Sequence, residues 1–232
     1  MNQTKYDLVV FGATSFVGQI LTRYLAEYFA DHKEQLNWAI AGRSQQKLQH
    51  VKDALGTAGQ AIPILVADAN NQTELDALCA QTRVVVSTVG PYALYGEPLV
   101  QACVNNGTDY CDLTGETQWI KQMITKYEAQ AQQSGARIVH CCGFDSVPSD
   151  MGVYYLQQQA QQQFNAPATQ VSMRVRTLKG GASGGTVASL INVVQEAAAD
   201  PALRKDLLNP YILCPADHGN TQRQIYIKTA KF

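Results

Sequence analysis

Two glycines and a serine follow the first apolar run of the chain with the spacing of a phosphate-binding turn. The stretch DLVVFGATSFVGQILTRYL places Gly12 directly after the run and Gly18 inside the segment that follows. Gly12 permits a tight reversal, and Gly18 permits close packing of a helix against a strand. The free amides and partial positive charge at the start of such a helix attract a pyrophosphate. Ser15 stands where a dinucleotide-binding turn usually has its middle glycine, and its hydroxyl can donate to a phosphate oxygen.

We therefore predict that this turn binds a dinucleotide. The alternative is a plain strand–turn–helix in which the glycines serve only packing. The predicted cofactor contacts in the turn are Gly12, Thr14, Ser15, Phe16, Val17 and Gly18.

The end of the second apolar run indicates which cofactor the turn binds. An NAD site normally has an acidic residue here for the ribose 2′-hydroxyl, but the stretch WAIAGRSQQKL has Arg43 and Ser44 instead. The planar, permanently charged fork of Arg43 suits a 2′-phosphate, and Lys47 follows one turn later. The alternative is a solvated Arg and Lys at a helix start. Together with the first turn, this pattern predicts NADP (NADPH) as the cofactor.

The ends of the third and fourth apolar runs should reach the same edge of the sheet, where ligands bind in this class of fold. Asp68 follows PILVA, and we expect it either to cap the next segment or to meet the adenine amino group. The stretch VVVSTVGPYALYGEPLV ends the fourth run. Thr88, Val89 and Gly90 are candidate contacts for the nicotinamide half, and Pro91 stiffens the exit.

The fifth and sixth runs end in YCDLTGE and VHCCGFDSVPSD, and polar side chains gather there. We expect the following residues near one cleft: Asp112, Thr114, Glu116, His140, Asp145 and Ser146. Asp145 and Ser146 are the predicted catalytic residues on the substrate side, although capping and turn formation are alternative roles for the acidic groups. No tyrosine has a lysine four residues later, so the Tyr-x-x-x-Lys pair of short-chain dehydrogenases is absent.

These motifs lie on an alternation of strand-like and helix-like segments, which predicts a parallel sheet. The predicted strands are Tyr6–Phe11, Asn37–Ala41, Ile62–Val66, Val84–Thr88, Asp109–Asp112 and Arg137–His140. The predicted helices between them are Phe16–Phe29, Gln45–Leu55, Gln72–Cys79, Glu97–Asn105 and Gln118–Ser134. Gly56, Gly107 and Gly135 stand where left-handed helix terminators belong. The fold class is therefore α/β, a Rossmann doubly wound parallel sheet, over residues 1–145.

The rhythm changes over residues 146–232, which we expect to form part of an α+β domain. A helix is predicted over Ser149–Gln163 with Ser149 as its cap, and a second helix over Val187–Ala199. Between them, TQVSMRVRTLKG alternates like a half-buried strand.

Composition narrows the function classes. The 232 residues carry a net charge of −1, which gives no basic footprint for nucleic acid. The six cysteines form no C-x-x-C pair, so we expect buried thiols in a reducing cytoplasm and no metal site. No signal peptide and no apolar run long enough to span a bilayer are present, which predicts a cytoplasmic protein.

Taken together, the motifs resemble the saccharopine dehydrogenase-like oxidoreductases, in the branch of the trans-acting enoyl reductases. The resemblance rests on GATSFVG, AGRS-QQKL, STVGPYALYGEPLVQAC, GTDYCDLTGE, GFDSVPSDMG and GGASGGT. It implies an NADP-dependent oxidoreductase that reduces a C=C bond of a lipid-type enoyl substrate, and it is compatible with peripheral membrane association. Members of the family are considerably longer, so we expect a C-terminally truncated chain.

Three alternatives stay open at this point. The first is an imine-reducing, saccharopine-type dehydrogenase. The second is an NADP-binding sensor or interaction protein without turnover, and the third is an inactive fragment. The sequence leaves the substrate and the oligomeric state undetermined.

Overall fold

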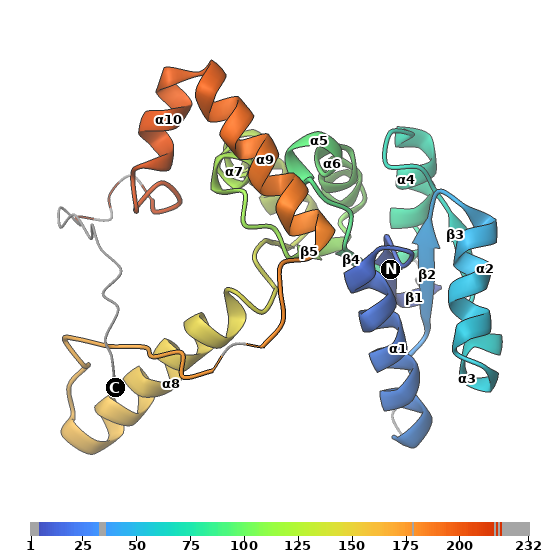
Figure 1. Cartoon of the computed structure of the whole chain (residues 1–232), viewed down its shortest axis with the longest axis horizontal. Helices are drawn as coiled ribbons and strands as arrows, with labels where there is room; N and C mark the ends of the chain where they lie inside the picture. The colour runs from blue at the N-terminus through green and yellow to red at the C-terminus, as the bar shows by residue number, and fades with distance from the viewer. Residues whose placement is uncertain (1–4, 33–35, 178, 216, 218, 220–232) are drawn as a thin grey trace.

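A single six-stranded parallel sheet forms the centre of the N-terminal part of the chain (Figure 1). The computed structural model describes residues 5–32, 36–177, 179–215, 217 and 219. The strand order is β3-β2-β1-β4-β5-β6, which is the doubly wound order of dinucleotide-binding folds. The strands are β1 (Tyr6–Phe11), β2 (Trp38–Gly42), β3 (Ile64–Val66), β4 (Thr82–Ser87), β5 (Asp109–Asp112) and β6 (Ile138–Val139). The predicted fold class is confirmed, and each predicted strand exists with shifts only at its ends.

Helices cover both faces of this sheet because its central strands are apolar on both sides. Val10 and Ile40 lie in one core cluster, whereas Val9 and Phe11 lie in the other. The first face is covered by α1 (Phe16–Asp31), α2 (Gln45–Ala54) and the short α3 (Thr57–Gln60). The second face carries α4 (Gln72–Cys79), α5 (Tyr92–Tyr95), α6 (Glu97–Asn106) and α7 (Thr117–Ser134).

Glycines end two of these helices as predicted. Gly107 and Gly135 adopt the left-handed conformation after α6 and α7, with φ of 66° and 80°. The prediction for Gly56 is wrong in detail, because its φ of 61° is combined with a ψ of −133°, outside the left-handed helical region. Gly56 precedes α3, a one-turn helix that the sequence did not reveal.

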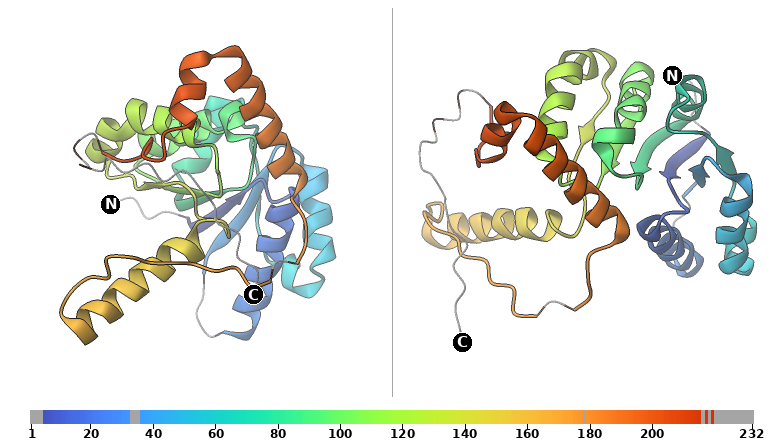
Figure 2. Two further views of the ribbon diagram at one scale, coloured as in Figure 1. Left: turned by 60° about the vertical axis from the view of Figure 1, so that its left-hand side comes forward. Right: turned by 45° about the horizontal axis from the view of Figure 1, so that its top comes forward.

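Beyond the sheet, the chain continues through α8 (Val147–Phe164), α9 (Gly184–Ala199) and α10 (Pro201–Leu207). In both views of Figure 2, α8 projects away from the sheet, whereas α9 and α10 lie beside α7. The prediction that Ser149 caps this helix is wrong. α8 starts earlier, at Val147, and Ser146 occupies the cap position without a side-chain hydrogen bond.

The predicted strand over TQVSMRVRTLKG is also wrong. Residues 169–177 and 179–180 contain no strand, and Leu178 lies outside the described residues. A strand needs a neighbouring strand and an apolar layer beneath one face, and the described part of the chain supplies neither here. Met173 and Val175 are accordingly exposed.

The cysteines also depart from expectation. Cys79 and Cys103 are buried, but Cys142 and Cys214 are exposed. The expectation of buried thiols is therefore wrong for these last two positions.

Candidate functional site

The turn between β1 and α1 leaves no room for a side chain at either of its two glycines. Gly12 has a φ of +86°, and a Cβ there would lie 2.6 Å from Cγ2 of Val89. A Cβ on Gly18 would lie 2.2 Å from the carbonyl oxygen of Gly12. Both contacts are far inside van der Waals distance, so the turn requires glycine at each position.

Ser15 has a defined role in this turn. It is the N-cap of α1, and its Oγ accepts a hydrogen bond from the Gly18 amide at 2.9 Å. The same oxygen lies 3.0 Å from Oγ1 of Thr88 at the end of β4. Because the Gly12 carbonyl takes the Thr88 proton at 2.9 Å, Ser15 donates its own proton to Thr88. Ser15 thus joins the first turn of α1 to the end of β4.

A groove of about 290 Å³ runs along the carboxyl ends of β1 to β4. Its lining residues are Phe11, Gly12, Thr14, Ser15, Gly42, Arg43, Ala67, Asp68, Ala69, Asn70, Thr88, Val89, Gly90 and Tyr95. Eight of the predicted cofactor contacts therefore lie together in one groove: Gly12, Thr14, Ser15, Arg43, Asp68, Thr88, Val89 and Gly90. Arg43 is exposed and follows β2, as the NADP prediction requires.

The other predicted cofactor contacts lie elsewhere. Gly18 packs beneath the turn, and Phe16 and Val17 line a second cavity. Ser44 caps α2, where its Oγ accepts a hydrogen bond from the Lys47 amide at 3.3 Å. The last three predicted contacts do not line the groove: Ser44, Lys47 and Pro91.

Asp68 forms a turn and does not cap a helix. Its Oδ1 accepts a hydrogen bond from the Asn70 amide at 2.9 Å, while Asn71 is the N-cap of α4. Sequence reasoning missed Asn70 as a groove residue. The signal that would have found it is its place in the loop between β3 and α4, next to Asp68, since every strand end in this sheet reaches the same edge.

A second cavity of about 310 Å³ adjoins the groove, and the two share Ser15, Thr88 and Gly90. Its walls come from the start of α1, the loops after β4 and β5, Asp145 and the first turns of α9. The other lining residues are Phe16, Val17, Tyr92, Leu113, Thr114, Gly115, Glu116, Ser183, Gly185, Thr186, Ser189, Leu190 and Val193. The structure therefore brings Thr114, Glu116 and Asp145 into one cleft, as expected.

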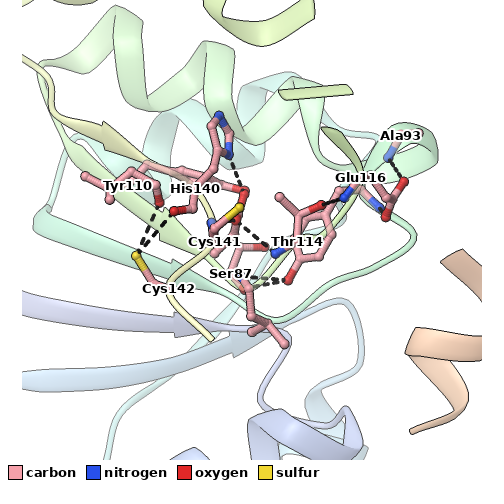
Figure 3. A network of polar contacts seen from close by, with 12 residues as sticks. Ser87, Ala93, Tyr110, Thr114, Glu116, His140, Cys141 and Cys142 are labelled. Carbon is pink, nitrogen blue, oxygen red and sulfur yellow. Dashed lines mark hydrogen bonds and ion pairs between the residues drawn. The ribbon is translucent and has the colours of Figure 1, made fainter. Parts of the chain in front are cut away.

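Asp112 and His140, in contrast, do not line this cavity and bind each other inside the protein. Asp112 is 1% exposed, and its carboxylate accepts hydrogen bonds from the Tyr110 hydroxyl at 2.9 Å and from two backbone amides. Nδ1 of His140 lies 2.7 Å from the same carboxylate (Figure 3). Burial raises the pKa of Tyr110 well above its ordinary value, which keeps this hydroxyl a donor. The expectation that Asp112 and His140 face the cleft is wrong, because two backbone amides bind Oδ1 of Asp112 while the Tyr110 hydroxyl and Nδ1 of His140 occupy Oδ2.

Some polar side chains at the cavity are already hydrogen-bonded within the protein, and others are exposed to the cavity. The Tyr92 hydroxyl donates to the Ser87 carbonyl at 3.0 Å, and burial raises its pKa above the ordinary value, so it is a poor proton source. Asp145 is exposed and faces the cavity. Ser146 precedes α8 and does not line the cavity, so its catalytic role stays a prediction.

The doubly wound sheet, the glycine turn and the groove with Arg43 define a dinucleotide-binding protein of the Rossmann class. The sequence model of the saccharopine dehydrogenase NADP binding domain matches residues 8–139, and the chain belongs to this family. Its cofactor is accordingly NADP(H). The donor set fits that group: Arg43 replaces the acidic residue of NAD sites, and Gly12, Thr14 and Ser15 bring the start of α1 to the same groove, where its free amides suit a pyrophosphate.

Two curated relatives match most of this chain. A Mycobacterium tuberculosis protein provisionally named a trans-acting enoyl reductase is 48% identical over 93% of this chain and 50% of its own length. The trans-acting enoyl reductase of Mycobacterium ulcerans is 39% identical over 91% of this chain and 50% of its own length. The chain thus spans about half the length of these relatives.

Among solved structures, saccharopine dehydrogenase (L-Glu forming) from Saccharomyces cerevisiae shares the fold. Its TM-score is 0.54 at 18% identity, over 68% of this chain and 32% of that protein. Within the described ranges, no helix is both long and apolar enough to cross a bilayer.

Proposed function

We propose that this chain carries the NADPH site and the adjoining substrate wall of a reductase that acts on the C=C bond of an uncharged, lipid-type enoyl group. The observation that carries the proposal is the junction of two cavities at Ser15, Thr88 and Gly90. One cavity has the donors for a dinucleotide, and the other lies beside its nicotinamide end. Such a junction places a hydride donor next to its acceptor.

The lining of the second cavity supports an uncharged acceptor. Phe16, Leu113 and Leu190 supply apolar surface, and several hydroxyls supply neutral hydrogen bonds. None of the described lining residues is Lys, Arg or His, whereas Glu116 and Asp145 are acidic. An imine formed from dicarboxylic amino acids carries carboxylates that need cationic partners. The charge of this wall therefore favours the enoyl substrate over the saccharopine-type imine.

Each part of the proposed site has its own residues. The first-turn amides of α1, from Phe16 and Val17, have no intrahelical acceptors and would bind the pyrophosphate. Arg43 binds the 2′-phosphate, and residues 88–91 support the nicotinamide. When bound, NADPH supplies the hydride. Asp145 faces the acceptor and is our candidate for the group that directs a proton to it.

The proposal also divides the chain in two. Residues 1–145 form the cofactor domain, and residues 146–232 belong to the substrate side. A cytoplasmic location and a lipid-derived substrate are part of the same proposal.

Fluorescence titration with NADPH and NADH, followed by an oxidation assay, tests this function. We expect NADPH to bind in the sub-millimolar range and more tightly than NADH. An enoyl thioester should then oxidise bound NADPH, whereas an imine of a 2-oxo dicarboxylic acid should not.

The other outcomes are equally informative. Binding of neither nucleotide contradicts the cofactor assignment and leaves an inactive fragment. NADPH binding with no oxidation by either acceptor indicates a sensor without turnover. Oxidation by the imine alone would make the chain saccharopine-type.

A further inference from the structure

A buried carboxylate joins the cofactor side of the cleft to the substrate side. Glu116 is 2% exposed, although it lines the second cavity. Its Oε1 accepts hydrogen bonds from the Tyr92 amide and from the Ser189 hydroxyl, both at 2.8 Å. Its Oε2 accepts a hydrogen bond from the Ala93 amide at 3.0 Å. Figure 3 shows the side chain directed toward the Ala93 amide at the start of α5.

The two ends of this link have different functions in the proposed site. Tyr92 and Ala93 form the first turn of α5, immediately after the loop 88–91 that supports the nicotinamide. Free amides at a helix start favour a negative charge, which explains how the Tyr92 and Ala93 amides stabilise a buried acid here. Ser189 belongs to α9, whose first turns form the far wall of the cavity.

Polar contacts hold α9 against the nucleotide-binding part. Besides the Glu116–Ser189 bond, Nε2 of Gln118 donates to Glu196 at 3.1 Å. The apolar side chains of α9, such as Leu190 and Val194, are largely exposed, so no hydrophobic interface fixes this helix among the described residues. Ser189 also lies close to Gly90, where a Cβ would be 3.8 Å from the Ser189 hydroxyl. The position of α9 over the nicotinamide loop therefore depends on a few hydrogen bonds.

We infer that Glu116 is a positioning residue that couples the nicotinamide loop to the substrate wall on α9 through Ser189. The inference rests on the proposed function for the roles of the nicotinamide loop and the substrate wall. The hydrogen bonds of Glu116 to α5 and α9 are themselves a property of the fold. Changes at the nicotinamide loop should reach α9 through this carboxylate. Its loss should misalign acceptor and cofactor without removing the distant contacts at Arg43.

The chemistry of the carboxylate makes the link specific. All three partners are donors, and an ionised carboxylate has acceptors for every one of them. In Glu116→Gln, the amide group offers only one acceptor oxygen and directs an N–H toward one of these donors. Ser189→Ala removes a single donor, whereas Ser189→Thr retains it.

Hydrogen exchange of the full chain, with and without NADPH, tests the coupling. We expect NADPH to slow exchange in residues 184–190 of the wild type and of Ser189→Thr, and this protection to be lost in Ser189→Ala. Glu116→Gln should in addition speed exchange at the Tyr92 and Ala93 amides at least several-fold. The NADPH dissociation constant should stay within about twofold in Ser189→Ala, because Arg43 and the α1 turn are untouched.

Gln195→Ala, an exposed position on the same helix, is the matched control and should behave as the wild type. In the oxidation assay, Ser189→Ala should lower kcat with little change in KM for NADPH. Equal protection of α9 in Ser189→Ala and in the control, or no protection in the wild type, would overturn the coupling. Because exchange requires only NADPH, absence of enoyl reduction with coupling intact would refute the substrate assignment alone.

Discussion

The hydroxyls of Ser15 and Thr88 lie 3.0 Å apart and join the first turn of α1 to the end of β4. Thr88 in turn bonds the Gly12 carbonyl at 2.9 Å. The residue that replaces the usual middle glycine is therefore part of the scaffold, because it holds the turn and the loop after β4 together. This arrangement explains how the groove keeps its shape with a side chain at a position normally left empty.

The first prediction concerns this cap. Ser15→Ala should lower the free energy of unfolding by about 1 kcal/mol, because the Gly18 amide loses its acceptor. Ser15→Gly should cost only a few tenths of a kcal/mol, since glycine is tolerated at N-caps. Urea unfolding of the three proteins measures the difference. Equal losses in both variants would show that the cap does not contribute.

The second prediction concerns close backbone contact. Gly18→Ala should destabilise the chain by about 1–3 kcal/mol, although alanine normally favours a helix. A Cβ at 2.2 Å from the Gly12 carbonyl forces the turn apart. Gly42→Ala is the control, because its Cβ would lie 3.7 Å from Leu48 in ordinary contact. Thermal unfolding that ranks the two variants the other way would contradict the close approach of Gly18 to Gly12.

The third prediction concerns cofactor choice. Arg43→Ala should weaken NADPH about 10- to 100-fold, because a charged hydrogen bond to the 2′-phosphate is lost. NADH should be almost unaffected, since it lacks that phosphate. Lys47→Ala is a suitable comparison, because Lys47 follows Arg43 by one turn but does not line the groove. Fluorescence titration gives all the dissociation constants, and parallel losses for both nucleotides would exclude the assignment of Arg43.

The fourth prediction concerns acid stability. The hydrogen bonds of the Arg137 guanidinium hold the pKa of Asp109 below its ordinary value of 3.8. A lowered folded-state pKa stabilises the protein above the ordinary value, and this contribution is lost as pH falls through the folded-state pKa. Asp109→Asn should therefore lower Tm at pH 7, and the difference from the wild type should shrink below about pH 4.

Asp53→Asn, at an exposed position on α2, is the control for this pH series. It should leave Tm nearly unchanged across the range. A Tm difference for Asp109→Asn that stays constant from pH 7 to pH 3 would show that the pair with Arg137 does not account for it.

The alternation of short apolar runs and helices predicted the sheet, because buried parallel strands are apolar on both faces and the β-α rhythm permits few topologies. The same logic placed Arg43 and Thr88 at one edge. It failed over residues 169–177, where alternation alone indicated a strand. Whether an alternating segment becomes a strand depends on a partner strand, which is a property of the tertiary structure and not of the segment.

The acidic residues at the carboxyl end of β5 show the same division. The sequence determined that Asp112 ends a strand and that Glu116 follows it, and therefore that both lie near the ligand edge. Only the tertiary structure decided that the Asp112 carboxylate is fully hydrogen-bonded by Tyr110, His140 and backbone amides. It also decided that Glu116 accepts hydrogen bonds from both α5 and α9. Strand ends are fixed by local periodicity, but a carboxylate takes whichever donors the folded chain brings within hydrogen-bond distance, and those donors come from segments far apart in the sequence.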